Sequence, residues 1–265
     1  MNRFSWLCIL LFIPLLDLHA QTEYLLEHET IPGTDTVWVF TPESYNPELK
    51  YPVVYMLHGY SSNYSQWHQI MDAQSYANEY NMIIVSPDGF FDSWYLNSPK
   101  KEDSQFIDFF FDQLVPFLDE KYSIDDRNRF ITGLSMGGHG ALLLFLNSPQ
   151  FFNTAGSTSG IMDLRSIDKL FGINDHLGAL EEGEELWLSL SAIGNISKLK
   201  ETGREIIFDC GTEDPFYEWN KVFYEKCLEE KVPTTFISQA GKHDWDYWAK
   251  SIRAHFLFFE SNLRK

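Results

Sequence analysis

The feature that most constrains this chain is a serine flanked by glycines where a predicted strand meets a predicted helix. A β-rich run at 130–132 is followed by Gly-Leu-Ser-Met-Gly at 133–137, and small residues then open a helix-like segment. This context predicts a nucleophile elbow with Ser135 at its tip. Gly133 and Gly137 are needed there, because a Cβ at either position would collide with the neighbouring strand or helix. A glycine-rich turn without chemistry is the alternative that the local pattern leaves open.

Segments typical of strands and of helices alternate along most of the chain. The predicted strands are 23–29, 36–41, 51–57, 82–85, 130–132, 153–159, 205–210 and 234–238. The predicted helices are 67–80, 104–120, the segment after the elbow, 216–231 and 247–259. The first two strands are expected to form an antiparallel edge, and the alternation predicts a mainly parallel sheet with helices on both faces. The fold class is therefore α/β.

One long segment breaks this alternation. Residues 160–203 show no clear helical or strand period, and they carry an acidic patch at 181–185. Such a patch is more often a solvated face than a site. We expect an irregular insertion that lies above the sheet.

The length and the N-terminus predict one exported domain. Hydrophobic residues make up 44% of the 265 residues, and no linker or repeat divides residues 21–265. Residues 1–20 contain Arg3, an apolar run at 7–16 and a small residue at Ala20, which is typical of a signal peptide. The apolar run is about half as long as a membrane-spanning helix, so we expect no stable membrane insertion. We predict cleavage near Ala20 and a periplasmic or secreted mature chain, with a buried N-terminal strand as the alternative.

Charge and cysteine content limit the partners. The formal net charge is −18 at pH 7, and such a field repels nucleic acid and anionic lipid surfaces, so a neutral or cationic substrate is expected instead. Cys227 is expected about 16 Å along a helix from the strand end at Cys210, beyond the reach of a disulfide, so two free thiols are predicted. No His or Cys cluster has metal-ligand spacing, so no metal or other cofactor is expected. A homo-oligomer is left open.

A serine hydroxyl needs a base to take its proton and an acid to orient that base. His243 is the candidate base, because it lies in the loop after the last predicted strand and follows Ser135 in the chain. Asp214 is favoured as the acid over Glu213, and Asp209 is set aside because it falls within a strand and would lie beneath the site. Asp214 could instead cap the helix that follows it.

The remaining site predictions rest on position. A tetrahedral oxyanion needs N–H donors, and the backbone groups of Met136 and Tyr60 are expected to supply them. His139 is expected to line the pocket or to make a packing contact, and His58 to order its loop by hydrogen bonds. No functional role is expected for four other histidines, which are His28, His68, His176 and His255.

Five motifs in this order resemble one known family. They are Leu57-His58-Gly59, Pro87-Asp88-Gly89 with Asp92-Ser93-Trp94-Tyr95, Gly133-Leu134-Ser135-Met136-Gly137-Gly138, Cys210-Gly211-Thr212-Glu213-Asp214 and Gly241-Lys242-His243-Asp244-Trp245. Together they resemble the esterase D branch of the α/β-hydrolase superfamily, which includes feruloyl, acetyl-xylan and tributyrin-type esterases and S-formylglutathione hydrolases. The resemblance spans 51–248 and implies an α/β-hydrolase fold. It also implies five roles, with Ser135 as nucleophile, Asp214 as acid, His243 as base, and Tyr60 and Met136 as oxyanion donors.

The resemblance does not define the substrate. Export argues against S-formylglutathione hydrolase, whose role in the family is cytosolic, and favours removal of feruloyl or acetyl groups from plant polysaccharide. Trp94 and Tyr95, with Trp219 and Trp245, could stack on a phenolic ring or a sugar, although core packing is the alternative for each. The rival functions are a general short-chain carboxylesterase of the tributyrin type, an S-formylglutathione hydrolase-like enzyme, and a non-catalytic carbohydrate-binding protein on the same fold.

Overall fold

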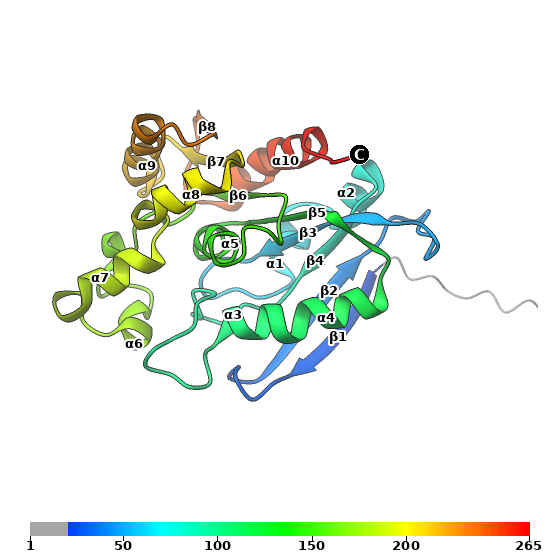
Figure 1. Cartoon of the computed structure of the whole chain (residues 1–265), viewed down its shortest axis with the longest axis horizontal. Helices are drawn as coiled ribbons and strands as arrows, with labels where there is room; N and C mark the ends of the chain where they lie inside the picture. The colour runs from blue at the N-terminus through cyan, green and yellow to red at the C-terminus, as the bar shows by residue number, and fades with distance from the viewer. Residues whose placement is uncertain (1–20) are drawn as a thin grey trace, which may run out of the picture.

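The computed structural model describes residues 21–265, so the predicted signal peptide lies outside the described residues. Eight strands form one sheet in the order β1-β2-β4-β3-β5-β6-β7-β8 (Figure 1). The strands are β1 (Gln21–Glu27), β2 (Thr34–Phe40), β3 (Tyr51–Leu57), β4 (Ile83–Ser86), β5 (Ile124–Gly133), β6 (Thr154–Thr158), β7 (Ile206–Gly211) and β8 (Thr234–Gln239). Strand β2 is antiparallel to both β1 and β4, and the other neighbouring pairs are parallel. The predicted antiparallel edge and mainly parallel sheet are confirmed.

Strand β3 lies at the centre of the sheet and has an apolar sequence, because both of its faces are covered. Val53, Tyr55 and Leu57 belong to the hydrophobic cluster on one face of the sheet, and Val54 and Met56 belong to the cluster on the other. All five side chains are fully buried. Successive side chains of a strand point to opposite faces, so a strand covered on both sides must be apolar throughout.

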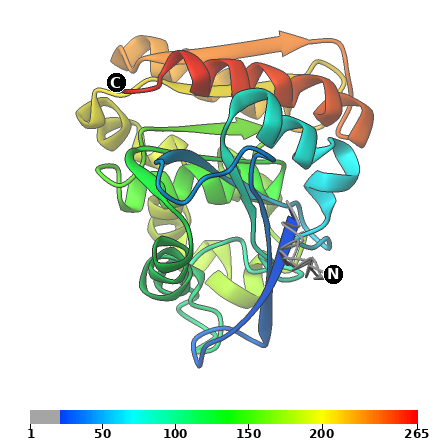
Figure 2. The ribbon, with the colours of Figure 1, turned by 90° about the vertical axis from the view of Figure 1, so that its right-hand side faces the viewer.

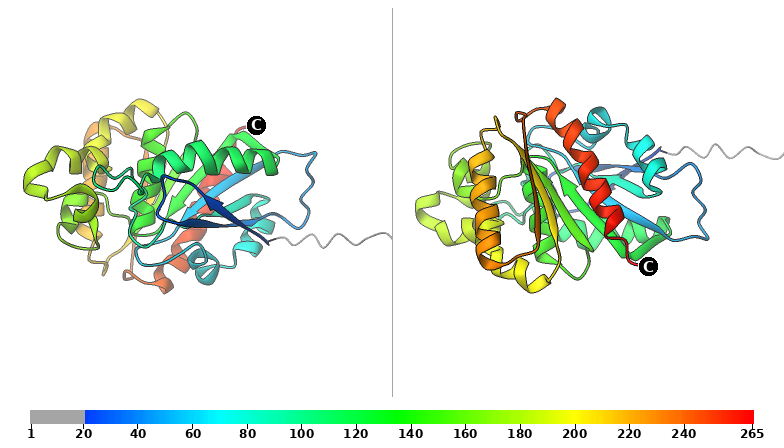
Figure 3. Two further views of the ribbon diagram at one scale, coloured as in Figure 1. Left: turned by 90° about the horizontal axis from the view of Figure 1, so that it is seen from below. Right: turned by 90° about the horizontal axis from the view of Figure 1, so that it is seen from above.

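Helices cover both faces of the sheet, as the alternation predicts. They are α1 (Gln66–Ile70), α2 (Ala73–Tyr80), α3 (Phe106–Phe109), α4 (Val115–Lys121), α5 (Met136–Asn147), α9 (Tyr217–Glu230) and α10 (Trp245–Ser261). Helices α1, α2 and α10 bury their apolar side chains in one cluster, and α3, α4, α5 and α9 bury theirs in the other. Figures 2 and 3 show α10 running across one face with α1 and α2 beside it. The α/β-hydrolase fold class is confirmed.

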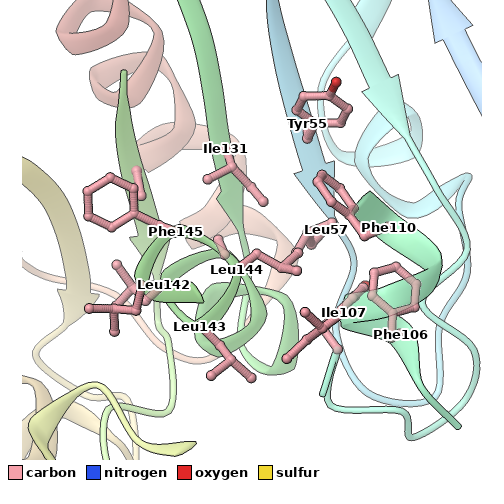
Figure 4. Close-up of a cluster of buried hydrophobic side chains, with 14 of the residues drawn as sticks. Tyr55, Leu57, Phe106, Ile107, Phe110, Ile131, Leu142, Leu143, Leu144 and Phe145 are labelled. Atoms are coloured by element: carbon pink, nitrogen blue, oxygen red, sulfur yellow. The ribbon is translucent and has the colours of Figure 1, made fainter. Parts of the chain in front are cut away.

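Helix α5 lies deepest in the larger cluster. Its residues from Met136 to Leu146 are all buried, which is the pattern of a helix covered on every side. Figure 4 shows its leucines on the face of the sheet that carries Tyr55 and Leu57. The ring of Phe110 meets that of Tyr55 edge-on at 5.1 Å between centroids. The helix that follows the elbow is therefore buried among the strands and the neighbouring helices.

Two predicted helices are interrupted. The segment predicted as one helix at 67–80 is α1 and α2, because Asp72 takes an extended conformation and its carboxylate accepts hydrogen bonds from the N–H and hydroxyl of Ser75, at 3.3 and 2.6 Å. The segment predicted at 104–120 contains a π-helical turn, η1 (Phe110–Leu114), between α3 and α4. Both interruptions leave the apolar faces where the periodicity places them.

The expectation of irregular structure at 160–203 is wrong. The segment consists of η2 (Leu164–Ile167), α6 (Ile173–Leu177), α7 (Leu180–Leu190), η3 (Ile193–Asn195) and α8 (Ile196–Thr202). These pieces are short and separated by turns, including left-handed φ values of 70° at Gly172 and 84° at Gly178, so no helical period extends far enough to be recognised. Trp187 and Leu199 are fully buried and anchor the segment, and α6 and α7 project at the left of Figure 1. The four glutamates of the acidic patch are exposed, as expected.

Candidate active site

Ser135 sits at a sharp turn between β5 and α5. Its backbone has φ 54° and ψ −116°, a conformation that a residue with a side chain rarely adopts. A Cβ at Gly133 would collide with the carbonyl of Gly137, and a Cβ at Gly137 would collide with the carbonyls of Leu57 and His58. The predicted elbow geometry, and the need for both glycines, are seen in the structure.

Backbone hydrogen bonds hold this turn between two neighbouring strands. The N–H of Leu134 donates to the carbonyl of Leu57 on β3 at 3.2 Å. The N–H of Ser135 donates to the carbonyl of Thr158 on β6 at 3.0 Å. The strained serine is therefore fixed from both sides by the sheet.

The structure brings Ser135, His243 and Asp214 together from the loops or turns after β5, β8 and β7. The Oγ of Ser135 lies 3.0 Å from Nε2 of His243. Nδ1 of His243 lies 2.8 Å from Oδ2 of Asp214. Because a carboxylate can only accept, Nδ1–H donates to Asp214, which leaves Nε2 free to accept from the serine hydroxyl. This is the arrangement that a serine nucleophile requires.

The carboxyl side chain of Asp214 is fully buried. Burial opposes its ionisation, but hydrogen bonds from His243 and from the N–H of Phe216, the latter at 2.8 Å, outweigh burial and hold the pKa of Asp214 below its usual value. The bond to Phe216 orders the turn before α9, but the N-cap of that helix is Phe216 and not Asp214, so the capping alternative is wrong. Glu213 is exposed and makes no hydrogen bond to His243.

The imidazole of His243 is held by its neighbours. The rings of Phe216 and Trp248 meet it edge-on, at 5.2 and 5.1 Å between centroids. Asp244 caps α10 by accepting from the N–H of Tyr247 at 2.9 Å, so the helix begins directly after the histidine. The side chain of His243 remains 23% exposed, which leaves the face toward the cavity open to a substrate.

The loop that carries Tyr60 is ordered by side chains on two sides. Gln66 accepts from the N–H of Gly59 at 2.8 Å. Nδ1 of His58 donates to the carbonyl of Gly59, and its Nε2 accepts from the N–H of Gly89, both at 2.7 Å. His58 therefore orders its loop by hydrogen bonds, as expected, and ties it to the loop after β4.

The two predicted oxyanion donors are the backbone N–H groups of Met136 and Tyr60. Met136 is the first residue of α5, where the helix dipole favours negative charge. Tyr60 lines the cavity in front of Ser135. Within residues 21–265, the backbone N–H groups of Tyr60 and Met136 donate to no other backbone carbonyl. Their role as oxyanion donors stays a prediction.

A cavity of about 520 Å³ opens beside Ser135. Its lining is mostly aromatic and aliphatic, and it comprises Gly59, Tyr60, Gln66, Trp94, Leu134, Ser135, Ile161, Ser166, Leu170, Phe171, Pro215, Phe216, Trp219, His243 and Trp248. Among residues 21–265, no Lys, Arg, Asp or Glu belongs to this lining. The cavity is suited to an uncharged, apolar group.

Trp94 and Tyr95 lie differently from one another. Trp94 lines the cavity, and its indole N–H donates to the carbonyl of Phe171 at 3.2 Å, which ties the wall formed by the insertion to the loop after β4. Tyr95 is fully buried, and its hydroxyl donates to the carbonyl of His58 at 2.9 Å. The prediction that Tyr95 binds substrate is therefore wrong. Left-handed φ values of 53° and 55° at these two residues turn the chain, so that the tyrosine ring packs where a Cβ on Gly140 of α5 would lie.

His139 does not line the cavity, so its prediction as a substrate-binding residue is also wrong. It is buried on α5, and its ring meets that of Trp94 edge-on at 5.9 Å between centroids. Burial lowers the pKa of His139 to about 4, so the ring is neutral at pH 7. It makes the packing contact that the sequence left as the alternative, and it supports Trp94 from behind.

Sequence reasoning missed part of the cavity wall. Leu170 and Phe171 come from the insertion and are 50% and 40% exposed. The rings of Phe171 and of the exposed Phe91 both meet that of Tyr60 edge-on, at 5.3 and 5.0 Å. An apolar pair in an otherwise polar loop is the signal that could have identified Leu170 and Phe171. Trp219 lines the cavity and Trp245 does not.

Other predicted properties concern metals, membranes and thiols. Among residues 21–265, no group of three or more His, Cys, Asp or Glu side chains is arranged to hold a metal ion. None of the helices in the described part of the chain combines the length and hydropathy needed to cross a bilayer.

Cys210 and Cys227 are both free and buried, as predicted, and burial raises the pKa of Cys227 to about 12.

Comparisons with known proteins identify the family of this chain and several similar proteins. The model of the family described as "Putative esterase" matches residues 29–259. The chain is 31% identical to an acetyl esterase of Caldicellulosiruptor saccharolyticus over 75% of this chain and 79% of that protein. It is 24% identical to an S-formylglutathione hydrolase of Mus musculus over 78% of this chain and 81% of that protein. A solved structure of a ferulic acid esterase superposes with a TM-score of 0.78 at 24% identity, covering 92% of this chain and 98% of that one.

Proposed function

Because this chain is an esterase that belongs to the "Putative esterase" family of α/β-hydrolases, we propose that it is exported and removes feruloyl or acetyl groups from plant polysaccharide. In this proposal, Ser135, His243 and Asp214 are the catalytic triad. The substrate is a neutral carboxylic ester, and no cofactor takes part.

The proposed reaction proceeds through an acyl-enzyme. His243 Nε2 takes the proton of Ser135 Oγ as that oxygen attacks the ester carbonyl carbon, and the carbonyl oxygen becomes an anion. The N–H groups of Tyr60 and Met136 stabilise this anion. The intermediate then collapses, the alcohol leaves with the proton from His243, and the acyl group stays on Ser135. Water then attacks the acyl carbonyl carbon as His243 takes its proton, and collapse of the second intermediate releases the carboxylic acid and restores the serine hydroxyl.

The observation that carries the choice of substrate is the uncharged aromatic lining of the cavity. A cavity of about 520 Å³ with Trp94 and Phe216 in its wall has room for a planar phenolic acyl group. Glutathione carries two carboxylates and an ammonium group, and in the part of the chain that the structure describes no Lys or Arg lines the cavity to receive a carboxylate. The similarity to an acetyl esterase and to the fold of a ferulic acid esterase supports the same choice.

A general short-chain carboxylesterase is the second candidate. The identity of 31% to an acetyl esterase favours it, because an acetyl group is a short acyl chain. Such a group would fill little of the cavity. In that case, the aromatic wall would add little to the binding of substrate. A comparison of methyl ferulate and acetylated xylan with tributyrin therefore separates the two candidates.

The substrate proposal is tested with a panel of methyl ferulate, acetylated xylan, tributyrin and S-formylglutathione. We expect the highest kcat/KM for methyl ferulate or acetylated xylan. A preference for tributyrin would favour the short-chain carboxylesterase, and a preference for S-formylglutathione would contradict both readings. A protein that binds xylan but cleaves none of the four esters would favour the non-catalytic alternative.

Export is tested separately by expressing the full chain in a bacterium and sequencing the N-terminus of the product. We expect a mature chain that begins at Gln21 in the periplasm or the medium. A cytoplasmic product that retains residues 1–20 would contradict export, and it would leave the esterase proposal standing.

A further inference from the structure

A second Asp–His pair lies in the core near the active site. Nε2 of His255, on α10, lies 2.7 Å from Oδ2 of Asp209, on β7. Both side chains are fully buried. Neither residue lines the cavity beside Ser135, so this pair does not touch a substrate there.

Hydrogen bonds extend the pair across three strands. Nδ1 of His255 lies 2.8 Å from Oγ1 of Thr132 on β5. Oδ1 of Asp209 accepts from the hydroxyl of Thr158 on β6 at 2.7 Å. A carboxylate at Asp209 accepts from both His255 Nε2–H and Thr158, and the other imidazole nitrogen accepts from Thr132. The network thus joins β5, β6 and β7 to α10.

The contact between His255 and Thr132 requires a glycine at position 156. A Cβ on Gly156 of β6 would lie 2.5 Å from Nδ1 of His255 and 2.9 Å from Oγ1 of Thr132. Such distances are shorter than real Cβ contacts, so any larger residue at this position would push the imidazole and hydroxyl apart. The absence of a side chain here allows the bond between β5 and α10.

Each strand in the network also carries part of the active site. Thr132 directly precedes the elbow, and the carbonyl of Thr158 accepts from the N–H of Ser135 at 3.0 Å. The carbonyl of Asp209 accepts from the N–H of Ser159 at 2.8 Å, and β7 leads into the turn that holds Asp214. A shift of these strand ends would therefore change the position of Ser135 relative to His243 and Asp214.

We propose that Asp209 and His255 are positioning residues for Ser135, an inference that rests on the proposed triad. They act through Thr132 and Thr158 and hold the ends of β5, β6 and β7 in one register, so that the serine hydroxyl stays in line with His243. Buried polar groups cost free energy to desolvate, and their hydrogen bonds are directional, whereas apolar contacts tolerate sliding. The network therefore determines the geometry of the strand ends.

Three substitutions separate this role from general stability. Asp209→Asn keeps the size of the side chain and removes its charge. Thr132→Val keeps the shape and removes the hydroxyl that meets His255. Thr132→Ser keeps that hydroxyl and is the conservative rescue.

A matched control lies elsewhere on β5. Arg129 is buried and bonded to Asp119 at 2.9 Å, and it lies away from the elbow. We expect Arg129→Met to lower the thermal midpoint and to leave the reactivity of the serine unchanged.

The measurements are the rate at which a fluorophosphonate labels Ser135, and kcat and KM for p-nitrophenyl acetate, all well below the thermal midpoint. We expect Asp209→Asn and Thr132→Val to slow labelling and lower kcat by about 10- to 100-fold with KM within about 2-fold, because small displacements of reacting groups cost rate more than binding. We expect Thr132→Ser to stay close to the wild-type rate.

Wild-type labelling rates in Asp209→Asn and Thr132→Val would overturn the proposal, as would an equal loss in Arg129→Met. If Asp209→Asn fails to fold, Thr132→Val is compared with Thr132→Ser. Slower labelling in Thr132→Val alone supports the proposal, and equal labelling rates in the two variants overturn it. A wild-type protein that is not labelled at Ser135 would instead refute the proposed triad. The two failures are therefore distinguishable.

Discussion

Nε2 of His243 lies 3.0 Å from Oγ of Ser135, although 108 positions separate the two residues in the chain. The parallel sheet brings them together, because the carboxyl ends of β5 and β8 lie at the same edge. The orientation of the imidazole depends on Asp214, which binds the opposite nitrogen at 2.8 Å.

Removing the charge of Asp214 is expected to lower activity strongly. In Asp214→Asn the amide can donate to Nδ1, which favours the tautomer whose Nε2 carries the proton and cannot accept that of Ser135. We expect kcat to fall by about 10²- to 10⁴-fold. Glu213→Gln is the control, because Glu213 is the adjacent carboxylate and is exposed. Equal losses in the two variants would show that Asp214 has no special role.

His139 is expected to make the fold less stable in acid. Burial lowers its pKa from 6.5 to about 4, so below about pH 6.5 the unfolded chain binds a proton that the folded protein does not. Stability therefore rises with pH between these two values and is lost as the pH falls. At pH 5 the loss due to this residue is about 2 kcal/mol relative to pH 7.

The measurement for His139 is the free energy of unfolding in urea at pH 7 and at pH 5. Other groups also titrate in this range, so the prediction concerns the difference between wild type and His139→Gln. We expect the variant to lose about 2 kcal/mol less than the wild type on acidification. The same pH dependence in both proteins would show that the buried histidine is not the source.

Trp94 is expected to contribute to the binding of large acyl groups. Trp94→Phe keeps an aromatic ring and loses the hydrogen bond to the carbonyl of Phe171, so the wall formed by the insertion is less firmly held. We expect KM for methyl ferulate to rise about 5-fold, with little change for p-nitrophenyl acetate. Trp245→Phe is the matched control, because Trp245 is 45% exposed and does not line the cavity. An equal effect on both substrates would contradict a role for Trp94 in acyl specificity.

The elbow and the triad could be predicted from the sequence because their signals are local. Ser135 lies in a pattern of glycines that only a tight strand-to-helix turn needs, and His243 and Asp214 each follow a recognisable strand. The order of strands and helices then brings these positions to one edge of the sheet. The edge pair β1 and β2 was predictable for a similar reason, since each has its own alternation or turn signal.

Side-chain directions could not be predicted where the chain turns sharply. Trp94 and Tyr95 are adjacent aromatics, and only the left-handed φ values of both residues send one to the cavity and the other into the core. His139 lies one helical turn after Ser135, and its burial depends on the packing of other elements around α5. These are tertiary effects with no local pattern.

The pairing of Asp209 with His255 was also beyond the sequence. The sequence predicts Asp209 in a strand and His255 on one side of an amphipathic helix. The two residues are 46 positions apart. Their contact depends on how α10 crosses the sheet and on the space left at Gly156. Most helices of the insertion were missed because they are too short to show a period, and the longest, α7, is interrupted at Gly183, where φ −150° and ψ 38° are not helical.

The most direct test of the account is labelling by a fluorophosphonate, combined with hydrolysis of p-nitrophenyl acetate, in the wild type and in Ser135→Ala. In the wild type we expect a single adduct, located by mass spectrometry on Ser135. In the variant we expect no adduct, a loss of hydrolysis of about 10⁴-fold or more, and an unchanged fold by circular dichroism. Labelling at another residue, or wild-type hydrolysis by Ser135→Ala, would contradict it.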